Sequence, residues 1–182
     1  MYKHCTTEES ALRQRHFEHC LQELMLTMPY PQITVSHICQ RAELSRKSFY
    51  RYFTGKEGCL CALLDHCIFE GAFQYLPENP RQLRSELFES FFLYWKQMHP
   101  LLDALIENHL DQRLVDRMMI YIREEEHNFQ HYIGSLHEDS DEQMLFMISG
   151  IMALVINWHK SGHQKSPGHM AEILEKILRS ET

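Results

Sequence analysis

The chain has 182 residues, of which 44% are hydrophobic and 24% are charged, so its composition is that of a folded protein and not of a disordered one. Its 18 Lys+Arg and 25 Asp+Glu residues give a formal net charge of −7. The longest nearly apolar run, residues 144–156, is shorter than the roughly 20 residues that a membrane-spanning helix needs. The opening MYKHCTTEES lacks the apolar stretch of a signal peptide. These features exclude a membrane protein and lead us to expect a cytoplasmic one.

The six cysteines all lie within the first 67 residues and form no Cys-x-x-Cys pair. Their spacing does not fit a disulfide framework, so we expect reduced thiols. Cys59, His66 and Cys67 share one helical stripe, which leaves open a thiol sensor beside the alternative of simple buried cysteines.

Helical periodicity runs through the chain, and no segment alternates long enough to predict a strand. Capping boxes at Thr6–Glu9 and Thr54–Glu57, together with N-caps at Thr34 and Ser45, mark four helix starts. We therefore predict an all-α fold with helices near residues 7–28, 35–41, 45–50, 54–75, 83–98, 101–110, 111–136, 143–160 and 170–177.

A linker containing Pro77 and Pro80 divides the predicted helices into two groups. We expect an N-terminal domain over residues 1–75, including a connecting helix over 54–75, and a C-terminal helical domain over 76–182.

The most informative segment is residues 33–60, where two short helices separated by about three residues predict a helix-turn-helix. Between residues 34 and 56 there are five cations and one anion, a local balance of 5 − 1 = +4 on an acidic chain. The second helix begins with Ser45, Arg46, Lys47 and Ser48, and its N-terminal N–H groups and dipole suit phosphate. Arginine and lysine there can also reach guanine in a major groove. Tyr50 and Lys56 are expected to contact backbone phosphates.

This segment resembles the DNA-binding domain of TetR-family transcriptional regulators over about residues 7–70. The matching positions are Thr34, Val35, Ile38, Ala42, Leu44, Ser45, Phe49, Tyr50, Phe53, Lys56 and Leu60. The resemblance implies that Phe49 and Phe53 pack the domain, whereas the residues that face DNA are Thr34, Ser45, Arg46, Lys47, Tyr50, Tyr52 and Lys56. Ser48, at the start of the second helix, completes the predicted DNA-binding set. Glu43 departs from the family pattern, which often has glycine in the turn; a positive φ there would cost Glu roughly 1 kcal/mol.

The last two predicted helices are the candidate dimer interface, because in the family they pair with their copies in a second subunit. Residues 143–160 are apolar on most faces, which fits a helix covered on both sides, although an ordinary core helix within one chain is the alternative. The interface candidates are Met144, Met147, Ile151, Leu154, Trp158, Ile173 and Ile177. A homodimer would match the two-fold symmetry of a palindromic operator in double-stranded DNA.

The resemblance also implies a small-molecule effector bound in the C-terminal domain. Aromatic and methionine side chains suit a hydrophobic or aromatic ligand, and the candidates are Phe91, Trp95, Met98, His99, Met118, Tyr121 and Ile122. The same residues at helical spacing equally fit a plain hydrophobic core.

Metal, cofactor and catalytic chemistry find little support. His127 and His131 are four residues apart, and His159, His163 and His169 flank the last turn, but neither group has a recognised ligand spacing. No GxSxG, P-loop, HExxH or GxGxxG motif occurs, so we expect no cofactor, no metal and no enzyme. The resemblance implies a homodimeric repressor that an effector releases from DNA. The alternatives are a co-activator or protein-interaction module of the same fold, and an all-helical enzyme.

Overall fold

The computed structural model describes residues 2, 3, 5, 7–72, 84–124 and 140–179. Over these residues the chain is all-helical, as predicted, and extended pairing is limited to one isolated bridge between Tyr2 and Phe53. The elements are α1 (Glu8–Met25), η1 (Tyr30–Gln32), α2 (Val35–Arg41), α3 (Arg46–Phe49), α4 (Lys56–Ala72), α5 (Arg84–Gln97), α6 (His99–Glu107), α7 (Asp111–Glu124), α9 (Ser140–Lys160) and α10 (Pro167–Arg179).

The chain divides into two compact units. The first comprises residues 1–67 and 100–112, and the second comprises residues 68–99 and 113–182. The sequence placed residues 100–112 in the C-terminal domain, whereas here they belong to the first unit. The functional domain limits, 1–75 and 76–182, stay a prediction.

Helix caps begin several elements of the first unit. Thr34 caps α2 as predicted, since its side chain accepts a hydrogen bond from the His37 N–H while His37 Nδ1 accepts one from the Thr34 N–H. Ser45 caps α3, also as predicted. The predicted capping box of Thr6 is wrong: Thr7 caps α1, because its hydroxyl reaches the Ser10 N–H at 3.3 Å.

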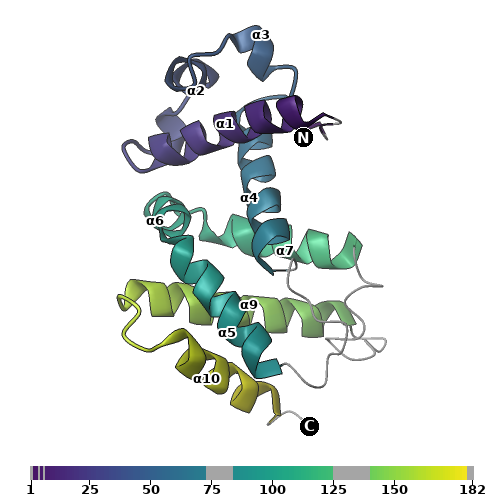
Figure 1. The fold of residues 1–182 in the computed structure, drawn as a ribbon, viewed down its shortest axis with the longest axis vertical. Helices are drawn as coiled ribbons and strands as arrows, with labels where there is room; N and C mark the ends of the chain where they lie inside the picture. The colour runs from purple at the N-terminus through teal and green to yellow at the C-terminus, as the bar shows by residue number, and fades with distance from the viewer. Residues whose placement is uncertain (1, 4, 6, 73–83, 125–139, 180–182) are drawn as a thin grey trace. The chain divides into compact units, whose positions relative to one another are not determined.

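The first unit is built around α1, with α2 packed against α1 and α3 against α2 (Figure 1). Phe17 of α1 is fully buried, and its ring lies 5.3 Å from that of Phe49 and 6.1 Å from that of Phe53. The prediction that Phe49 and Phe53 pack this domain is therefore confirmed.

Asn108, at the end of α6, joins this helix to the first unit. Its amide nitrogen donates to the carbonyls of Met25 and Ala104, at 2.9 and 2.8 Å, and its oxygen accepts from the Tyr30 N–H. These bonds satisfy backbone groups between α1 and η1, which is why residues 100–112 belong here.

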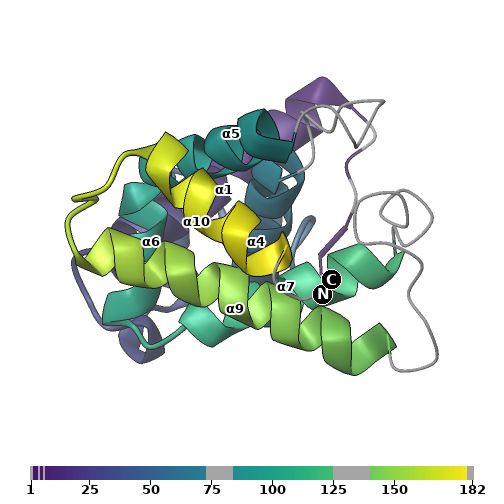
Figure 2. The ribbon, with the colours of Figure 1, turned by 90° about the horizontal axis from the view of Figure 1, so that it is seen from below.

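The second unit has α5 packed along α10 and in contact with α9. The pairing of α5 with α10 can be followed in both ribbon views (Figures 1 and 2). Phe92 and Trp95 of α5 are fully buried, and the Phe92 ring meets the edge of Trp158 at 5.5 Å. The predicted helix over 111–136 is seen as α7 up to Glu124, and its remainder lies outside the described residues, as do residues 73–75 of the predicted connecting helix.

Candidate nucleic-acid interface

The turn between α2 and α3 sets the angle at which α3 is presented. Glu43 has a φ of 54°, so this non-glycine residue is in the left-handed region, as the sequence analysis considered. The Glu43 N–H donates to the Gln40 carbonyl, and the Leu44 N–H donates to the Cys39 carbonyl at 3.0 Å. This pair of bonds is a Schellman motif, which ends α2 and reverses the chain into α3.

Helix α3 is shorter than the predicted two turns, with only residues 46–49 in helical bonding. The Ser45 hydroxyl accepts from the Ser48 N–H at 3.1 Å and fixes its start. Phe49 is fully buried, so the opposite side of α3 faces the surface. Arg46 and Lys47 are therefore exposed at the beginning of the helix.

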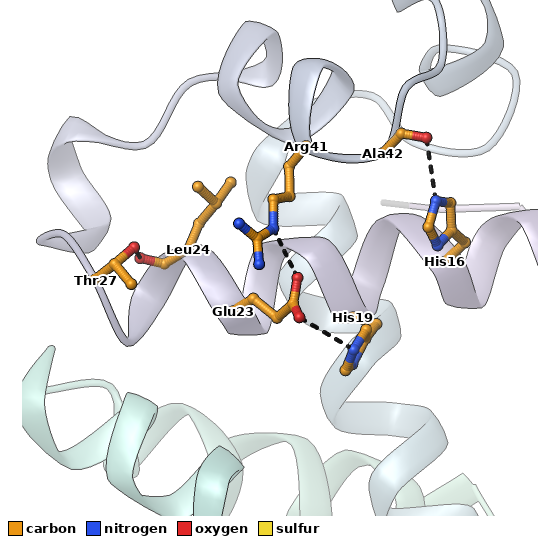
Figure 3. Close-up of polar contacts among 7 residues, drawn as sticks. All are labelled: His16, His19, Glu23, Leu24, Thr27, Arg41 and Ala42. Atoms are coloured by element: carbon orange, nitrogen blue, oxygen red, sulfur yellow. Dashed lines mark hydrogen bonds and ion pairs between the residues drawn. The ribbon is translucent and has the colours of Figure 1, made fainter.

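Contacts with α1 hold the turn and α2 in place (Figure 3). Arg41 donates to Glu23 Oε2 at 2.8 Å, His19 lies 3.5 Å from the other Glu23 oxygen, and His16 Nε2 lies 3.1 Å from the Ala42 carbonyl. The hydrogen bond from Arg41 lowers the pKa of Glu23 below its ordinary value. Because its charge is matched by Glu23, Arg41 supports the scaffold and adds little to the basic face.

Lys56 is also engaged within the chain. Its Nζ donates to the carbonyls of Tyr30, Pro31 and Ile33 at 2.8–3.2 Å and lies 4.5 Å from the centre of the Tyr30 ring. This lysine closes the turn before α2, because its ammonium binds three carbonyls of residues 30–33, among them that of Tyr30, which also accepts the Ile33 N–H. Its ammonium is thus not in the open position that the sequence analysis assigned to it.

Tyr52 likewise differs from its expected exposed position. It is only 8% exposed, and its ring packs 6.2 Å from Phe17 and 6.1 Å from Phe53. Tyr50, in contrast, is 47% exposed and lies under the Arg46 guanidinium at 6.0 Å. A hydrogen bond to Tyr50 raises the pKa of Arg46 above its ordinary value.

Of the predicted DNA-facing residues, those at the surface are Thr34, Ser45, Arg46, Lys47 and Tyr50, with Ser48 half-buried. Arg51 was counted in the charge balance but missed as a site residue. It is exposed directly after Tyr50, and the signal that could have identified it is its place one residue beyond the recognition helix.

Three of the seven effector candidates are part of the second unit's core. Trp95, Met118 and Ile122 are buried, whereas Phe91, Met98 and Tyr121 are half-buried and His99 is exposed. Phe91 and Trp95 are brought together at 6.2 Å. Trp95 is fully buried, and its Nε1 has no hydrogen-bond partner among the residues that the structure describes, so it is an available donor inside this unit.

The interface candidates fall on two different sides of α9 and α10. Met144 and Trp158 are 3% and 2% exposed, because they pack inside their own unit, and Trp158 Nε1 donates to the Lys165 carbonyl at 2.9 Å. These two residues do not offer a surface to a second subunit. Of the other interface candidates, Ile177 is 43% exposed. The half-buried candidates are Met147, Ile151, Leu154 and Ile173.

Histidines and cysteines show no assembled metal site in the described part of the chain, where no three ligand-type side chains converge. His159 and His163 face each other at 5.1 Å, and His127 and His131 lie outside the described residues. Cys59 is fully buried, and burial raises its pKa well above the ordinary value. Such a thiol is unreactive, which favours the buried-cysteine interpretation over a sensor. Within the same residues, no helix is both long and apolar enough to cross a membrane.

A short helix with an exposed cationic start, held by a Schellman turn on a supporting helix, defines a helix-turn-helix DNA-binding protein. A family profile described as "Bacterial regulatory proteins, tetR family" matches residues 23–63, and one described as "Transcriptional regulator C-terminal region" matches residues 84–180. The chain belongs to the TetR family of transcriptional regulators. It is therefore a DNA-binding transcription factor and not an enzyme.

Two relatives and two solved structures agree with this assignment. The chain is 32% identical over 77 residues to the HTH-type transcriptional regulator EthR of Mycolicibacterium smegmatis, covering 39% of this chain and 36% of EthR. It is 27% identical over 139 residues to the HTH-type dhaKLM operon transcriptional activator DhaS of Lactococcus lactis, covering 76% of this chain and 64% of DhaS. The chain thus spans less than two thirds of the length of either relative.

The structural comparisons concern the fold alone, since both identities are low. A transcriptional regulator assigned to the TetR family from Syntrophomonas wolfei superposes with a TM-score of 0.63 at 16% identity, covering 93% of this chain and 94% of the other. A transcriptional regulator from Pseudomonas aeruginosa PAO1 superposes with a TM-score of 0.64 at 14% identity, covering 96% and 92%.

Proposed function

We propose that this regulator is a cytoplasmic homodimeric repressor that binds a palindromic operator and leaves it when a small molecule binds the C-terminal helices. The observation that carries the proposal is the exposed pair Arg46 and Lys47 at the start of α3, on a turn braced by Glu23 and Arg41. A rigid mounting matters, because base contacts discriminate only when the side chains reach the groove in a fixed register.

The DNA contacts divide into two kinds. Arg46 and Lys47 can reach guanine edges in the major groove, where each well-formed bidentate contact discriminates by about 1–3 kcal/mol. Ser45, Thr34 and Tyr50 have hydroxyl groups at the same surface and suit backbone phosphates, which position the protein without specifying a sequence.

The homodimer is supported by an unpartnered face of α9. Phe146, Gly150, Ala153 and Asn157 are all exposed and follow one another at helical spacing, and Phe146 is 69% exposed. A Cβ added at Gly150 would meet no atom within 4 Å, so the backbone there is open to a close neighbour. We propose that this stripe contributes to the contact with the second subunit, in place of Met144 and Trp158.

The effector proposal rests on the aromatic interior of the second unit. Within the described part of the chain the N–H of buried Trp95 has no partner, and a ligand with a hydrogen-bond acceptor would satisfy it. Such an effector would be apolar or aromatic with at least one carbonyl, ether or ring nitrogen. It could release the operator only if it bound one arrangement of the dimer more tightly than the other.

Activation is the second candidate, because DhaS, the relative aligned over the larger share of this chain, is by its name a transcriptional activator. A reporter fused to the DNA upstream of the coding region separates the two. Deleting the regulator raises expression if it represses and lowers expression if it activates.

The direct test is fluorescence anisotropy with duplex DNA from upstream of the coding region, beside an unrelated duplex. We expect tight and salt-sensitive binding to the first duplex, and loss of the preference between duplexes in Arg46→Gln. Lys96→Gln, an exposed cation of α5, is the matched control and should bind as the wild type does. A regulator whose Arg46→Gln variant keeps its full preference would not read DNA through α3 as proposed.

A further inference from the structure

Three hydrogen bonds and one antiparallel bridge hold the N-terminal residues Tyr2, Lys3 and Cys5 on the helix-turn-helix unit. The Lys3 N–H donates to the Tyr52 carbonyl at 2.9 Å, and Tyr2 pairs antiparallel with Phe53. The Tyr2 hydroxyl donates to Asp65 at 2.7 Å, and the Cys5 thiol donates to the Gln14 side-chain oxygen at 2.7 Å. The start of the chain is therefore fixed beside the segment that follows α3.

A cavity of about 350 Å³ lies between this N-terminal segment, the start of α1 and the residues after α3. Its lining is polar, with three cations and one carboxylate, and consists of Lys3, Cys5, Glu9, Ser10, Arg13, Arg51 and Tyr52. Glu9 is bonded to Arg13 at 2.6 Å, so these two charges offset each other. The side chains of Lys3 and Arg51 have no ion pair or hydrogen bond within the described residues, which leaves two uncompensated positive charges on one cavity.

Two residues that line the cavity, Arg51 and Tyr52, directly follow α3 in the chain. Arg51 follows Tyr50, which ends α3, and Tyr52, whose carbonyl anchors Lys3, comes next. Lys3 and Arg51 are both exposed, so an anion can reach them without entering the protein.

We propose that this cavity binds a backbone phosphate of double-stranded DNA, next to the groove that α3 enters, with Lys3 and Arg51 as its ligands. The inference rests on the DNA binding of the family and adds a contact from the N-terminal segment. Arginine donates to phosphate oxygens through a planar fork, and lysine adds a point charge. Because Lys3 is already held by the Tyr52 carbonyl, little further ordering of the chain is needed when the phosphate binds. Arg51 and Lys3 thereby supply the phosphate contact that was predicted for Lys56, whose ammonium binds carbonyls of the chain instead.

The test uses a random-sequence duplex, because a phosphate contact forms on any sequence and needs no known operator. Binding of the full chain is measured by fluorescence anisotropy between 50 and 200 mM salt. Each lost phosphate contact reduces the steepness of log affinity against log salt by about 0.9. Between 50 and 200 mM salt, the affinity of such a variant therefore falls by a factor about 3.5 times smaller than that of the wild type. We expect this change in Lys3→Gln and in Arg51→Gln, and about twice the change in slope in the double variant.

Lys96→Gln is the matched control for removal of a surface cation, and thermal unfolding verifies that each variant is folded. A slope unchanged in Lys3→Gln, while Arg46→Gln loses the preference between the upstream and the unrelated duplex, would overturn the role of the N-terminal segment and leave DNA reading by α3 intact. A wild-type chain without salt-dependent binding to any duplex would overturn both.

A second arm distinguishes DNA from a free anion. Inorganic phosphate is added at constant ionic strength and the thermal stability of the wild type and Lys3→Gln is compared. Stabilisation of the wild type alone, with no change in the DNA salt slope of Lys3→Gln, would assign the cavity to a free anion and overturn the proposal.

Discussion

Replacement of Glu43 by glycine is expected to stabilise the first unit. Glu43 has a φ of 54°, and the left-handed conformation costs an L-residue about 1–2 kcal/mol. Glycine removes this cost, but it also increases the conformational entropy of the unfolded chain, which lowers the free energy of unfolding by roughly 0.5–1 kcal/mol. The Glu43 side chain has no hydrogen bond or ion pair within the described residues, so no compensating contact is lost. The expected net gain is about 0.5–1 kcal/mol.

Chemical denaturation followed by circular dichroism measures this gain directly. In a chain of this length, about 1 kcal/mol corresponds to a rise in Tm of about 2–4 °C. Glu43→Ala is the matched control, because it keeps the left-handed strain while removing the carboxylate, and Glu43→Gln isolates the charge. His109 has a φ of 55° at the end of α6, so His109→Gly should give a gain of the same sign.

If Glu43→Gly were no more stable than Glu43→Ala, strain at this position would not be the cost that the backbone geometry indicates. The turn would then have to relax in solution to a conformation that any residue tolerates. That outcome would also remove the reason for expecting α3 to be presented at a fixed angle.

Three further predictions follow from the first unit. Glu23→Gln should lower the free energy of unfolding by no more than about 1 kcal/mol at neutral pH, because the pair with Arg41 is exposed. Arg41 lowers the pKa of Glu23, so the wild type should stay more stable than the variant at any pH above the ordinary pKa of Glu. This difference in stability should vanish as the pH falls through the lowered pKa. A difference that instead grew in acid would contradict this sign. Phe49→Ala should lose about 3–5 kcal/mol in denaturant titration, since the ring is fully buried, and a loss under 1 kcal/mol would mean that α3 is not packed as described. In native protein, iodoacetamide followed by mass spectrometry should leave Cys59 unmodified until denaturant is added, and rapid native labelling of Cys59 would restore the thiol-sensor interpretation.

Much of the helix-turn-helix was predictable from the chain alone, because its determinants are local. Thr34 and Ser45 cap the two helices through hydrogen bonds to N–H groups three residues ahead, and the spacing of the caps is visible in the sequence. The resemblance to the TetR-family domain likewise predicted that Phe49 and Phe53 are buried, and both rings pack against Phe17. The departure at Glu43 could be recognised because only a few residue types suit a left-handed turn.

Tertiary packing decided what these local rules do not contain. Lys56 was predicted to face DNA, but carbonyls of residues 30–33 lie close enough to bind its ammonium, and that proximity depends on where η1 meets α4. Trp158 is buried because it meets Phe92 of another helix, which a periodic pattern cannot distinguish from a surface awaiting a second subunit. The sequence thus determined which segments are helical and which positions begin them. Only the folded chain decided which charges remain free, because a charge is free or paired according to residues that are distant in sequence and close in space.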